Sequence, residues 1–263
     1  MSSVSNPPVL RLDRICFSYK ENGFFINDLS FIIGEGESIG LLGANGSGKS
    51  TILKLGSGIL RPSSGNVVLW GKPINTYRNR DRAKLISYLP QILNFSVPFT
   101  LRELVSMGLY PYDISPPMTV KEALDMVGLR NKADSHITDL SGGEKRRAFI
   151  AMTLLQGAGL LFLDEPLANL DIRYQIELVR LLKRLKGERG ISIVMALHDI
   201  NIALQFEKVM LIKNGAVLSA GPPSEVLTDR LIREAFDVDV RMIREPEGKA
   251  YVRYEDNFDE RMC

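Results

Sequence analysis

The sequence predicts an α/β fold in which a helical insert separates two stretches of mixed strands and helices. Short runs rich in β-branched and aromatic residues, divided by turn signals, dominate the first ninety or so residues. The pattern between residues 100 and 156 is helical, and after residue 157 buried strand patterns alternate with helical ones. We therefore expect the two α/β stretches to form one core that brackets the insert.

The first stretch is predicted to hold several short strands and one helix. Turn signals such as Glu21-Asn22-Gly23 separate the strand patterns. Residues 49–60 predict a helix, because Ile52, Leu55 and Ile59 fall on one helical face. The strands are expected at residues 9–12, 14–19, 24–25, 29–33, 38–42, 67–70 and 85–89.

The insert and the second stretch complete the pattern. Asn214-Gly215 between two apolar runs is a type I′ hairpin signal, and residues 238–254 are expected to form one more hairpin. Helices are expected at residues 101–109, 119–127, 141–156 and 172–186, and strands at residues 160–163, 191–197, 209–212 and 216–220.

The composition excludes several classes of protein. The 263 residues carry 33 Lys and Arg against 31 Asp and Glu, a net charge of +2, which argues against a nucleic-acid partner. A hydrophobic content of 45% is typical of a globular chain with a sizeable core. Apolar runs reach only five residues, far short of the roughly 18 that a spanning helix needs. The opening MSSVSNPPVL lacks the features of a secretory signal, so we expect a cytosolic chain.

Cysteine and histidine are too few to build a metal site on their own. Cys16 and Cys263 are the only cysteines, and we interpret them as free thiols in a reducing compartment. His136 and His198 are the only histidines, so any histidine chemistry must rest on a single imidazole.

The motif with the clearest chemistry is Gly43-Ala44-Asn45-Gly46-Ser47-Gly48-Lys49-Ser50, which matches G-x-x-x-x-G-K-[ST]. It follows an apolar strand pattern and precedes a helical one, as a phosphate-binding loop requires. Its backbone N–H groups and the helix N-terminus would hold phosphates. Lys49 would pair with the β- and γ-phosphates, and the Ser50 hydroxyl would bind Mg²⁺. A chance Gly-rich turn would not explain the strand and helix on either side.

A pair of carboxylates supplies the second part of a nucleotide-hydrolysing site. Asp164 and Glu165 follow the apolar strand pattern at residues 160–163. Asp164 would hold Mg²⁺, and Glu165 would polarise a water for in-line attack on the γ-phosphate. Because side chains alternate along a strand, we expect Glu165 to point away from Asp164. Without the phosphate loop, an acid pair at the entry to a loop would be the better interpretation.

The motif Leu140-Ser141-Gly142-Gly143-Glu144 narrows the family. As local chemistry it is a capping box, with Ser141 at the N-cap and Glu144 three residues later. It lies 23 residues before Asp164, and there it resembles the L-S-G-G-[QE] signature of the ATP-binding-cassette (ABC) ATPases. In that family the serine and second glycine, here Ser141 and Gly143, bind the γ-phosphate held on the opposite subunit. The resemblance implies a P-loop NTPase (RecA-like) core with an antiparallel β subdomain and an inserted α-helical subdomain.

The resemblance also assigns roles to residues elsewhere in the chain. Tyr19 matches the aromatic residue that stacks on adenine, although an ordinary strand aromatic would be the simpler interpretation without this context. Gln91 matches the glutamine that contacts Mg²⁺ and the attacking water. Asp171 matches the loop that communicates across the dimer, and His198 matches the histidine that contacts the γ-phosphate and positions the water with Glu165. The remaining residues expected to bind the nucleotide are Gly43, Asn45, Gly46, Ser47, Gly48, Lys49, Ser50 and Thr51.

Two segments depart from the family pattern. Glu144-Lys145-Arg146-Arg147 stands where many relatives read Gln-x-Gln-Arg. The stretch Leu167-Ala168-Asn169-Leu170-Asp171 replaces a frequent Thr-Ser-x-Leu-Asp, which is expected to alter contacts across the dimer and not the reaction.

The resemblance implies a domain organisation. Residues 1–92 and 157–240 would form the nucleotide-binding core with its β subdomain. Residues 93–156 would form the helical signature subdomain, and residues 241–263 a C-terminal tail.

The resemblance also implies a function, with ATP and Mg²⁺ as cofactors. The chain would be the ATP-hydrolysing subunit of a bacterial or archaeal importer, peripheral on the cytoplasmic face of the membrane. Its partners would be a second copy, membrane permease subunits docked near residues 91–108 and, indirectly, a solute-binding protein. Segments such as 97–104, 197–203 and 220–228 resemble importers of iron–siderophore, haem and vitamin B12. Zinc or manganese import stays open, because Gly108-Leu109-Tyr110-Pro111 replaces a common Gly-Arg-x-Pro, and so does a soluble, non-transport ABC ATPase.

Overall fold

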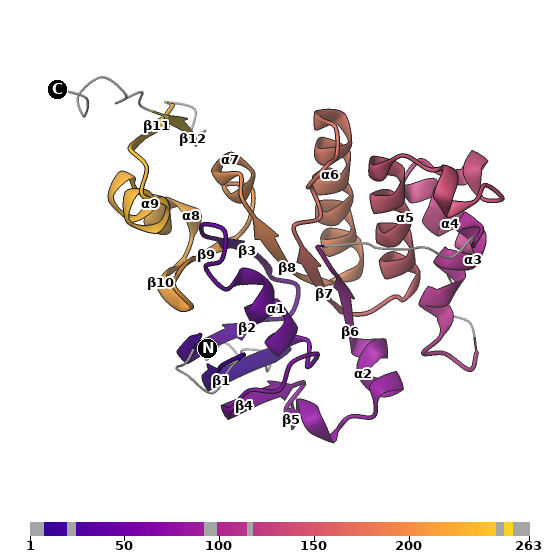
Figure 1. Ribbon diagram of the computed structural model, residues 1–263, viewed down its shortest axis with the longest axis horizontal. Coiled ribbons are helices and arrows are strands. Elements are labelled where there is room, and N and C mark those ends of the chain that lie inside the picture. The colour runs from indigo at the N-terminus through magenta and orange to yellow at the C-terminus, as the bar shows by residue number, and fades with distance from the viewer. Residues whose placement is uncertain (1–7, 20–24, 92–98, 115–117, 246–249, 255–263) are drawn as a thin grey trace, which may run out of the picture.

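The computed structural model describes residues 8–19, 25–91, 99–114, 118–245 and 250–254. It has an α/β architecture with a central sheet, a smaller antiparallel sheet on one side and a group of helices on the other (Figure 1). Phe24, residues 97–98 and Cys263, which entered the predictions above, lie outside the described residues. The predicted fold class is confirmed.

A six-stranded sheet forms the centre of the molecule, and its first five strands in spatial order from β6 are parallel. The last strand runs antiparallel because it is joined to its neighbour by the predicted hairpin at Asn214-Gly215. The order is β6 (Ile86–Leu89), β7 (Leu160–Asp164), β8 (Ser192–Leu197), β3 (Ser38–Leu42), β9 (Lys208–Lys213) and β10 (Ala216–Gly221).

The register of the parallel strands aligns their carboxyl ends. Leu42 at the end of β3 pairs with Leu197 at the end of β8, and Leu89 at the end of β6 pairs with Leu163 of β7. The loops that follow these strands therefore emerge at one edge of the sheet, where ligands bind in open α/β sheets.

A second, four-stranded sheet is antiparallel throughout. Residues 9–12 and 14–19, which the pattern divided into two strands, lie mostly in the single strand β1, whose pairing with β2 shifts register between Leu12 and Phe17. The order is β2 (Ile26–Ile33), β1 (Leu10–Phe17), β4 (Ser64–Leu69) and β5 (Lys72–Pro73).

Helix α1 (Lys49–Gly56) packs between the two sheets and contacts β7 and β8 (Figure 1). A Cβ placed on Gly56 would lie 3.0 Å from Cζ of Phe162, so the glycine allows the helix to approach this fully buried ring. The helix ends at Gly56 and not at the predicted residue 60, because the chain turns there and Gly58 takes a φ of 72°. Glycine adopts such left-handed backbone without steric cost.

The opposite face of the central sheet is covered by helices. The long helix α6 (Ile172–Arg189) buries Leu178, Leu182 and Leu185 in a core that it shares with the insert. The insert contains α3 (Leu101–Ser106), a 3₁₀ turn at Met107–Leu109, α4 (Val120–Met126) and α5 (Gly142–Leu155). Each of these α-helices begins with a capping box, formed by Thr100 with Glu103, Thr119 with Glu122 and Ser141 with Glu144.

The last part of the described chain forms short elements at one end of the sheet. The predicted hairpin is present, and the Val252 N–H donates a 2.8 Å hydrogen bond to Oδ1 of Asn201. Several short elements were not predicted: α2 buries no residue, and α7 and α8 have only four residues each. These unpredicted elements are β5, α2 (Asn79–Leu85), α7 (Ile200–Ala203), α8 (Pro223–Val226) and α9 (Asp229–Phe236), while β11 (Val240–Arg244) and β12 (Ala250–Tyr254) form the hairpin.

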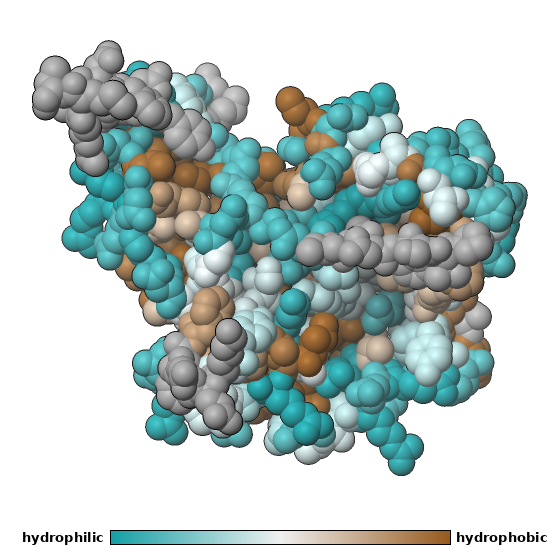
Figure 2. Space-filling model, viewed as in Figure 1, coloured by the Kyte–Doolittle hydropathy of each residue, from teal (hydrophilic) through white to brown (hydrophobic). Residues whose placement is uncertain are grey.

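The surface is that of a protein with mixed polarity. Polar residues dominate the face in Figure 2, and the apolar residues on it lie in small separate groups. Within the described residues, none of the helices combines the length and the apolar character required to cross a membrane.

Phe162 tests the packing between the sheets. Replacing it by alanine should lower the free energy of unfolding by about 3–5 kcal/mol, because the cavity left behind would be only partly filled. Denaturant unfolding measures the change. As a matched control, Ile32→Ala removes a side chain that is 55% exposed and should change stability by less than about 1 kcal/mol. Equal losses in the two variants would contradict the packing described above.

Candidate active site

The phosphate loop is the turn between β3 and α1, and its glycines are required by its shape. A Cβ on Gly43 would lie 2.2 Å from the carbonyl oxygen of Ile212. Gly46 and Gly48 have φ angles of 76° and 113°, which favour glycine. The Ser47 hydroxyl is buried and has no hydrogen-bond partner among the described residues. A loop of this shape, with an unsatisfied buried hydroxyl, fits an anionic ligand such as a phosphate.

Lys49 is buried inside this loop. Its Nζ donates hydrogen bonds to the carbonyl oxygens of Gly43, at 2.7 Å, and Ala44, at 3.1 Å. Burial lowers the pKa of Lys49, and the charges of Glu165 and Asp164 raise it in part. The ammonium group therefore lies within the loop, where it would meet a bound phosphate.

Asp164 lies at the end of β7 and is held by two hydroxyl groups. The Ser50 Oγ donates to its Oδ1 at 2.9 Å, and the Tyr88 hydroxyl donates to its Oδ2 at 3.1 Å. Burial raises the pKa of Asp164, whereas these two hydrogen bonds lower it. Burial also raises the pKa of Tyr88, and the Asp164 charge adds to that shift. Tyr88 was not predicted as a site residue; its place on the strand beside β7 was the available signal.

The oxygen atoms of Ser50 and Asp164 suit a magnesium ion. Within the described chain, no group of three or more His, Cys, Asp and Glu side chains could hold a metal. Mg²⁺ usually takes one or two protein oxygens, with phosphate oxygens and waters completing its shell. A hydroxyl and a carboxylate 2.9 Å apart fit that pattern.

Glu165 is held between residues that follow two other strands. Nε2 of Gln91, after β6, donates to its Oε2 at 2.6 Å. Nε2 of His198, after β8, lies 2.5 Å from its Oε1. Glu165 is one residue beyond β7 and has a left-handed backbone with φ 49°. The sequence predicted that the Glu165 side chain points away from that of Asp164, and the two side chains do have different partners. The left-handed turn at Glu165, and not the alternation of side chains along a strand, sets its direction.

Arg146 joins the start of the insert's longest helix to the chain that follows β6 and β7. Its guanidinium donates to the carbonyl oxygens of Pro90 at 3.0 Å and Gln91 at 2.7 Å. It also donates to the carbonyl oxygens of Asp164 at 2.8 Å, Pro166 at 3.2 Å and Glu165.

Burial lowers the pKa of Arg146, and the nearby Asp164 and Glu165 charges raise it in part. The side chain is only 4% exposed. Arg146 was not predicted as a site residue. The sequence did contain a pattern that pointed to it. Arg146 shares one face of its helix with Ile150 and Thr153, which are buried, and a charge on a buried face needs partners.

Tyr19 lies beside the phosphate loop. Its hydroxyl is 2.9 Å from the Oγ1 of Thr51 in α1. The ring packs edge-on against Phe17 at 4.8 Å and is 58% exposed. A ring that is fixed at its hydroxyl and open to solvent is suited to stacking on a flat ligand.

Three predicted site residues make no hydrogen bond with the loop, Asp164 or Glu165 among the described residues. Ser141 accepts a hydrogen bond from the Glu144 N–H, and in Figure 1 its helix, α5, stands apart from α1. Gly143 is in the first turn of the same helix. Asp171 is the N-cap of α6, but its side chain makes no capping hydrogen bond. Asn45, within the loop, is exposed. Within the part of the chain that the structure describes, one chain thus assembles the loop, Asp164 and Glu165 without a hydrogen bond from Ser141 or Asp171.

Comparison with known proteins identifies similar sequences. Residues 26–168 match the family model described as ABC transporter. The chain is 37% identical to the petrobactin import ATP-binding protein FpuC of Bacillus anthracis, over 88% of each chain. It is 38% identical to the iron(3+)-hydroxamate import ATP-binding protein FhuC of Bacillus subtilis, covering 84% of this chain and 85% of that one. It is 37% identical to the hemin import ATP-binding protein HmuV of Rhodopseudomonas palustris, covering 86% and 90%.

Solved structures are similar over most of the chain. One is an inward-facing conformation of a putative metal-chelate type ABC transporter, with a TM-score of 0.77 and 25% identity over 95% of this chain and 97% of that one. Another is a dimeric post-hydrolysis state of an ATP-binding cassette bound to ADP and Pi, with a TM-score of 0.74 and 26% identity over 81% of this chain and 98% of that one.

Arg146 can be tested by substitution. Arg146→Ala should lower the free energy of unfolding by at least about 2 kcal/mol, because it leaves buried carbonyl groups without their donor. It should also lower kcat for ATP hydrolysis about tenfold or more, since Gln91 and Glu165 would shift. Lys145→Ala, a change of similar size on the same helix, should alter neither quantity much. Normal stability and normal kcat in Arg146→Ala would contradict this role.

Proposed function

Because the chain belongs to the ABC transporter ATP-binding family, we propose that it is the ATP-hydrolysing subunit of an importer that takes up an iron chelate or cobalamin. The observation that carries the enzymatic part is the position of Glu165, between Gln91 and His198 and on the same sheet edge as Lys49 and Asp164. A carboxylate placed there can accept a proton from a water that attacks a phosphate held by the loop.

Each residue has a distinct proposed role. The loop N–H groups and Lys49 would bind the phosphates of ATP, and Tyr19 would stack on the adenine. Ser50 and Asp164 would hold Mg²⁺, which neutralises charge on the phosphates when it is bound. Gln91 and His198 orient the Glu165 carboxylate, and His198 would also contact the γ-phosphate. Arg146 holds the backbone of both loops in place.

A second copy of the chain would complete the site. In the described part of the structure, Ser141, Gly143 and Asp171 make no hydrogen bond with the phosphate loop of their own chain, and Ser141 and Gly143 open a helix whose N-terminus favours anions. We propose that Ser141 and Gly143 bind the γ-phosphate on the partner copy, and that Asp171 belongs to the loop that communicates across the dimer. ATP would then favour the closed dimer because it contacts both copies, and hydrolysis would remove that preference.

The membrane partner would dock on the helical insert. Exposed apolar side chains gather at the end of α3 and in the segment after it: Met107, Tyr110 and Ile114 are 38%, 76% and 87% exposed. We propose that these side chains offer an apolar surface for a permease subunit. We further propose the division into a core (residues 1–92 and 157–240), a helical subdomain (93–156) and a tail (241–263), and a location on the cytoplasmic face of the membrane.

The cargo proposal rests on the relatives, whose names specify petrobactin, iron(3+)-hydroxamate and hemin import. The subunit that hydrolyses ATP does not contact the cargo, so its sequence reports its permease partners and the cargo only through them. Zinc or manganese uptake is the alternative, because the segment at 108–111 departs from the common pattern near the docking surface.

Glu165→Gln tests the catalytic role. The variant should bind ATP and form a stable dimer on size-exclusion chromatography, with kcat lowered by about 10²–10⁴-fold, since the amide cannot accept the proton. Adding Ser141→Arg should abolish the dimer while each monomer still binds ATP. Lys49→Ala is the control for nucleotide affinity and should bind ATP weakly. Normal turnover in Glu165→Gln would exclude Glu165 as the base.

Isolation of the protein from native membranes tests the transport role. We expect an integral membrane permease to co-purify, and the reconstituted complex to take up a ferric siderophore, haem or cobalamin in an ATP-dependent way. Uptake of zinc or manganese instead would replace the proposed cargo. Co-purification with ribosomes or DNA, without a membrane protein, would reject the transporter function.

A further inference from the structure

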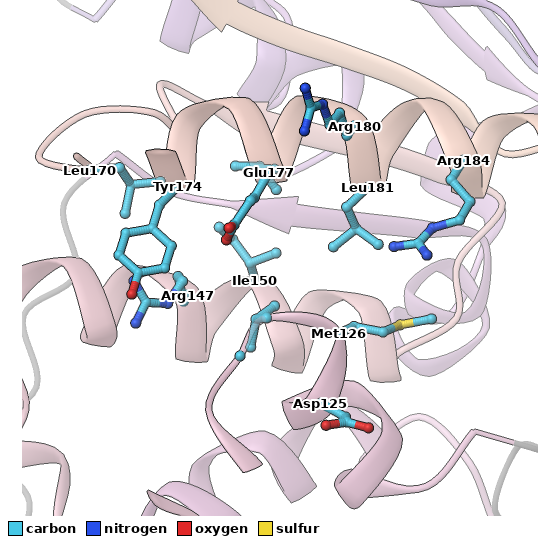
Figure 3. Close-up of a pocket in the computed structure, with 13 residues that line it drawn as sticks. Asp125, Met126, Arg147, Ile150, Leu170, Tyr174, Glu177, Arg180, Leu181 and Arg184 are labelled. Carbon is cyan, nitrogen blue, oxygen red and sulfur yellow. The ribbon is translucent and has the colours of Figure 1, made fainter. Parts of the chain in front are cut away.

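A cavity of about 320 Å³ lies between α6 and the ends of α4 and α5 (Figure 3). Its walls come from the core and from the insert: α6 packs on the central sheet, whereas α4 and α5 belong to the insert. The described residues that line it include none of those assigned above to the nucleotide or to catalysis. The cavity is therefore a feature that the proposed function does not use.

Arg147 forms one end of this cavity and carries a buried charge. Its side chain is 8% exposed, and its guanidinium carbon lies 3.6 Å from the centre of the Tyr174 ring. Its Nε has no hydrogen-bond partner among the described residues. The aromatic ring covers one face of the guanidinium but does not satisfy the donors at its edge. A buried guanidinium in this state is suited to an anionic acceptor.

The opposite end of the cavity is also positive. Arg184 lies on α6, three helical turns beyond Tyr174, and Figure 3 shows it at the far end of the row from Arg147. Arg180 contributes to the rim. Within the described chain, Arg147, Arg180 and Arg184 have no carboxylate within ion-pair distance.

The carboxylates beside the cavity already have partners. Asp125 lies 3.5 Å from Arg130, and Glu177 lies 2.9 Å from Arg173. Both carboxylates also belong to the cavity lining, and the Glu177 side chain points toward Ile150 in Figure 3. With Arg130 and Arg173 counted, five arginines stand against these two carboxylates. The local charge favours a ligand with more than one negative group.

Apolar side chains line the middle of the cavity, next to Glu177. Ile150 of α5 and Leu181 of α6 are both nearly fully buried and lie between Arg147 and Arg184 in Figure 3. A volume of about 320 Å³ is at the lower end of the range for small-molecule sites. We propose that this cavity binds a linear organic molecule with two anionic ends (a dianion in that sense), each a carboxylate or a phosphate group, and an apolar chain between them. One anionic end would lie on Arg147 and the other on Arg184, with the chain over Ile150 and Leu181.

The site borders Leu170, the residue before Asp171. A ligand there would contact the core and the insert at once, next to a loop that is proposed to face the second copy. Binding itself does not depend on ATP hydrolysis, so failure of the proposed function would leave this inference testable.

Calorimetric titration with defined probes tests the proposal. The protein is first saturated with Mg·ADP, so that the phosphate loop cannot bind the probe. Suberate and 1,6-hexanediol bisphosphate serve as the dicarboxylate and the bisphosphate. Octanoate, with one charge, and succinate, with a short chain, serve as matched ligands. We expect at least one of the two long dianions to bind, and to bind roughly tenfold or more tightly than octanoate and succinate.

Substitutions then locate the site. Arg147→Gln should weaken binding of the dianion about tenfold or more. Arg184→Gln, at an exposed position, should weaken it severalfold and should fold normally even if Arg147→Gln does not. Arg189→Gln, on the same helix but outside the cavity, should bind like the unchanged protein.

Three outcomes would overturn the proposal. One is that neither long dianion binds, which would leave the cavity to an acidic segment of a protein partner or to no ligand. Another is equal affinity for the long dianions, octanoate and succinate. The third is binding that persists unchanged in both Arg184→Gln and Arg147→Gln, which would place the probe outside the cavity.

Discussion

Parallel pairing of β3, β8, β7 and β6 in one register is the constraint on which the candidate active site depends. Gln91 and Glu165 are 74 residues apart in the chain, yet their side chains are joined by a 2.6 Å hydrogen bond. They meet because Leu89 and Leu163 pair at the ends of adjacent strands, and Asp164 pairs with Ala196, two residues before His198. The apolar side chains that fix this register are thus as necessary to the site as the polar ones, because a slip of one residue would turn each side chain to the other face.

The second general feature is a set of buried charges that compensate one another. Lys49, Arg146 and Asp164 are all nearly fully buried. Burial lowers the pKa of Lys49 and Arg146 and raises that of Asp164, so in each case it favours the neutral form. The Asp164 carboxylate raises the pKa of both cations in return. Removing one member of such a set is costly, because it leaves another charge buried without its partner. This mutual dependence couples the stability of the phosphate loop, the end of β7 and helix α5 of the insert.

The sequence predicted the parts of this structure that local patterns encode. The phosphate loop, the buried strands and the capping boxes each follow from a few neighbouring residues. Arg146 and Tyr88 were missed, because their importance arises from carbonyl and carboxylate groups that are distant in the chain. Helices α2 and α8 were missed because they are short and bury little. The orientation of Glu165 depends on a backbone turn, and such a turn has no residue pattern when the residue in it is not glycine.

That turn has a consequence for how the chain balances stability and activity. A non-glycine residue at φ 49° is strained by about 1 kcal/mol or more relative to glycine. Glycine at position 165 would relieve the strain and would also remove the carboxylate that Gln91 and His198 hold. Selection for folding alone would therefore favour a residue that could not perform the catalysis proposed for Glu165. Position 165 is thus a place where a more stable protein is expected to be an inactive one.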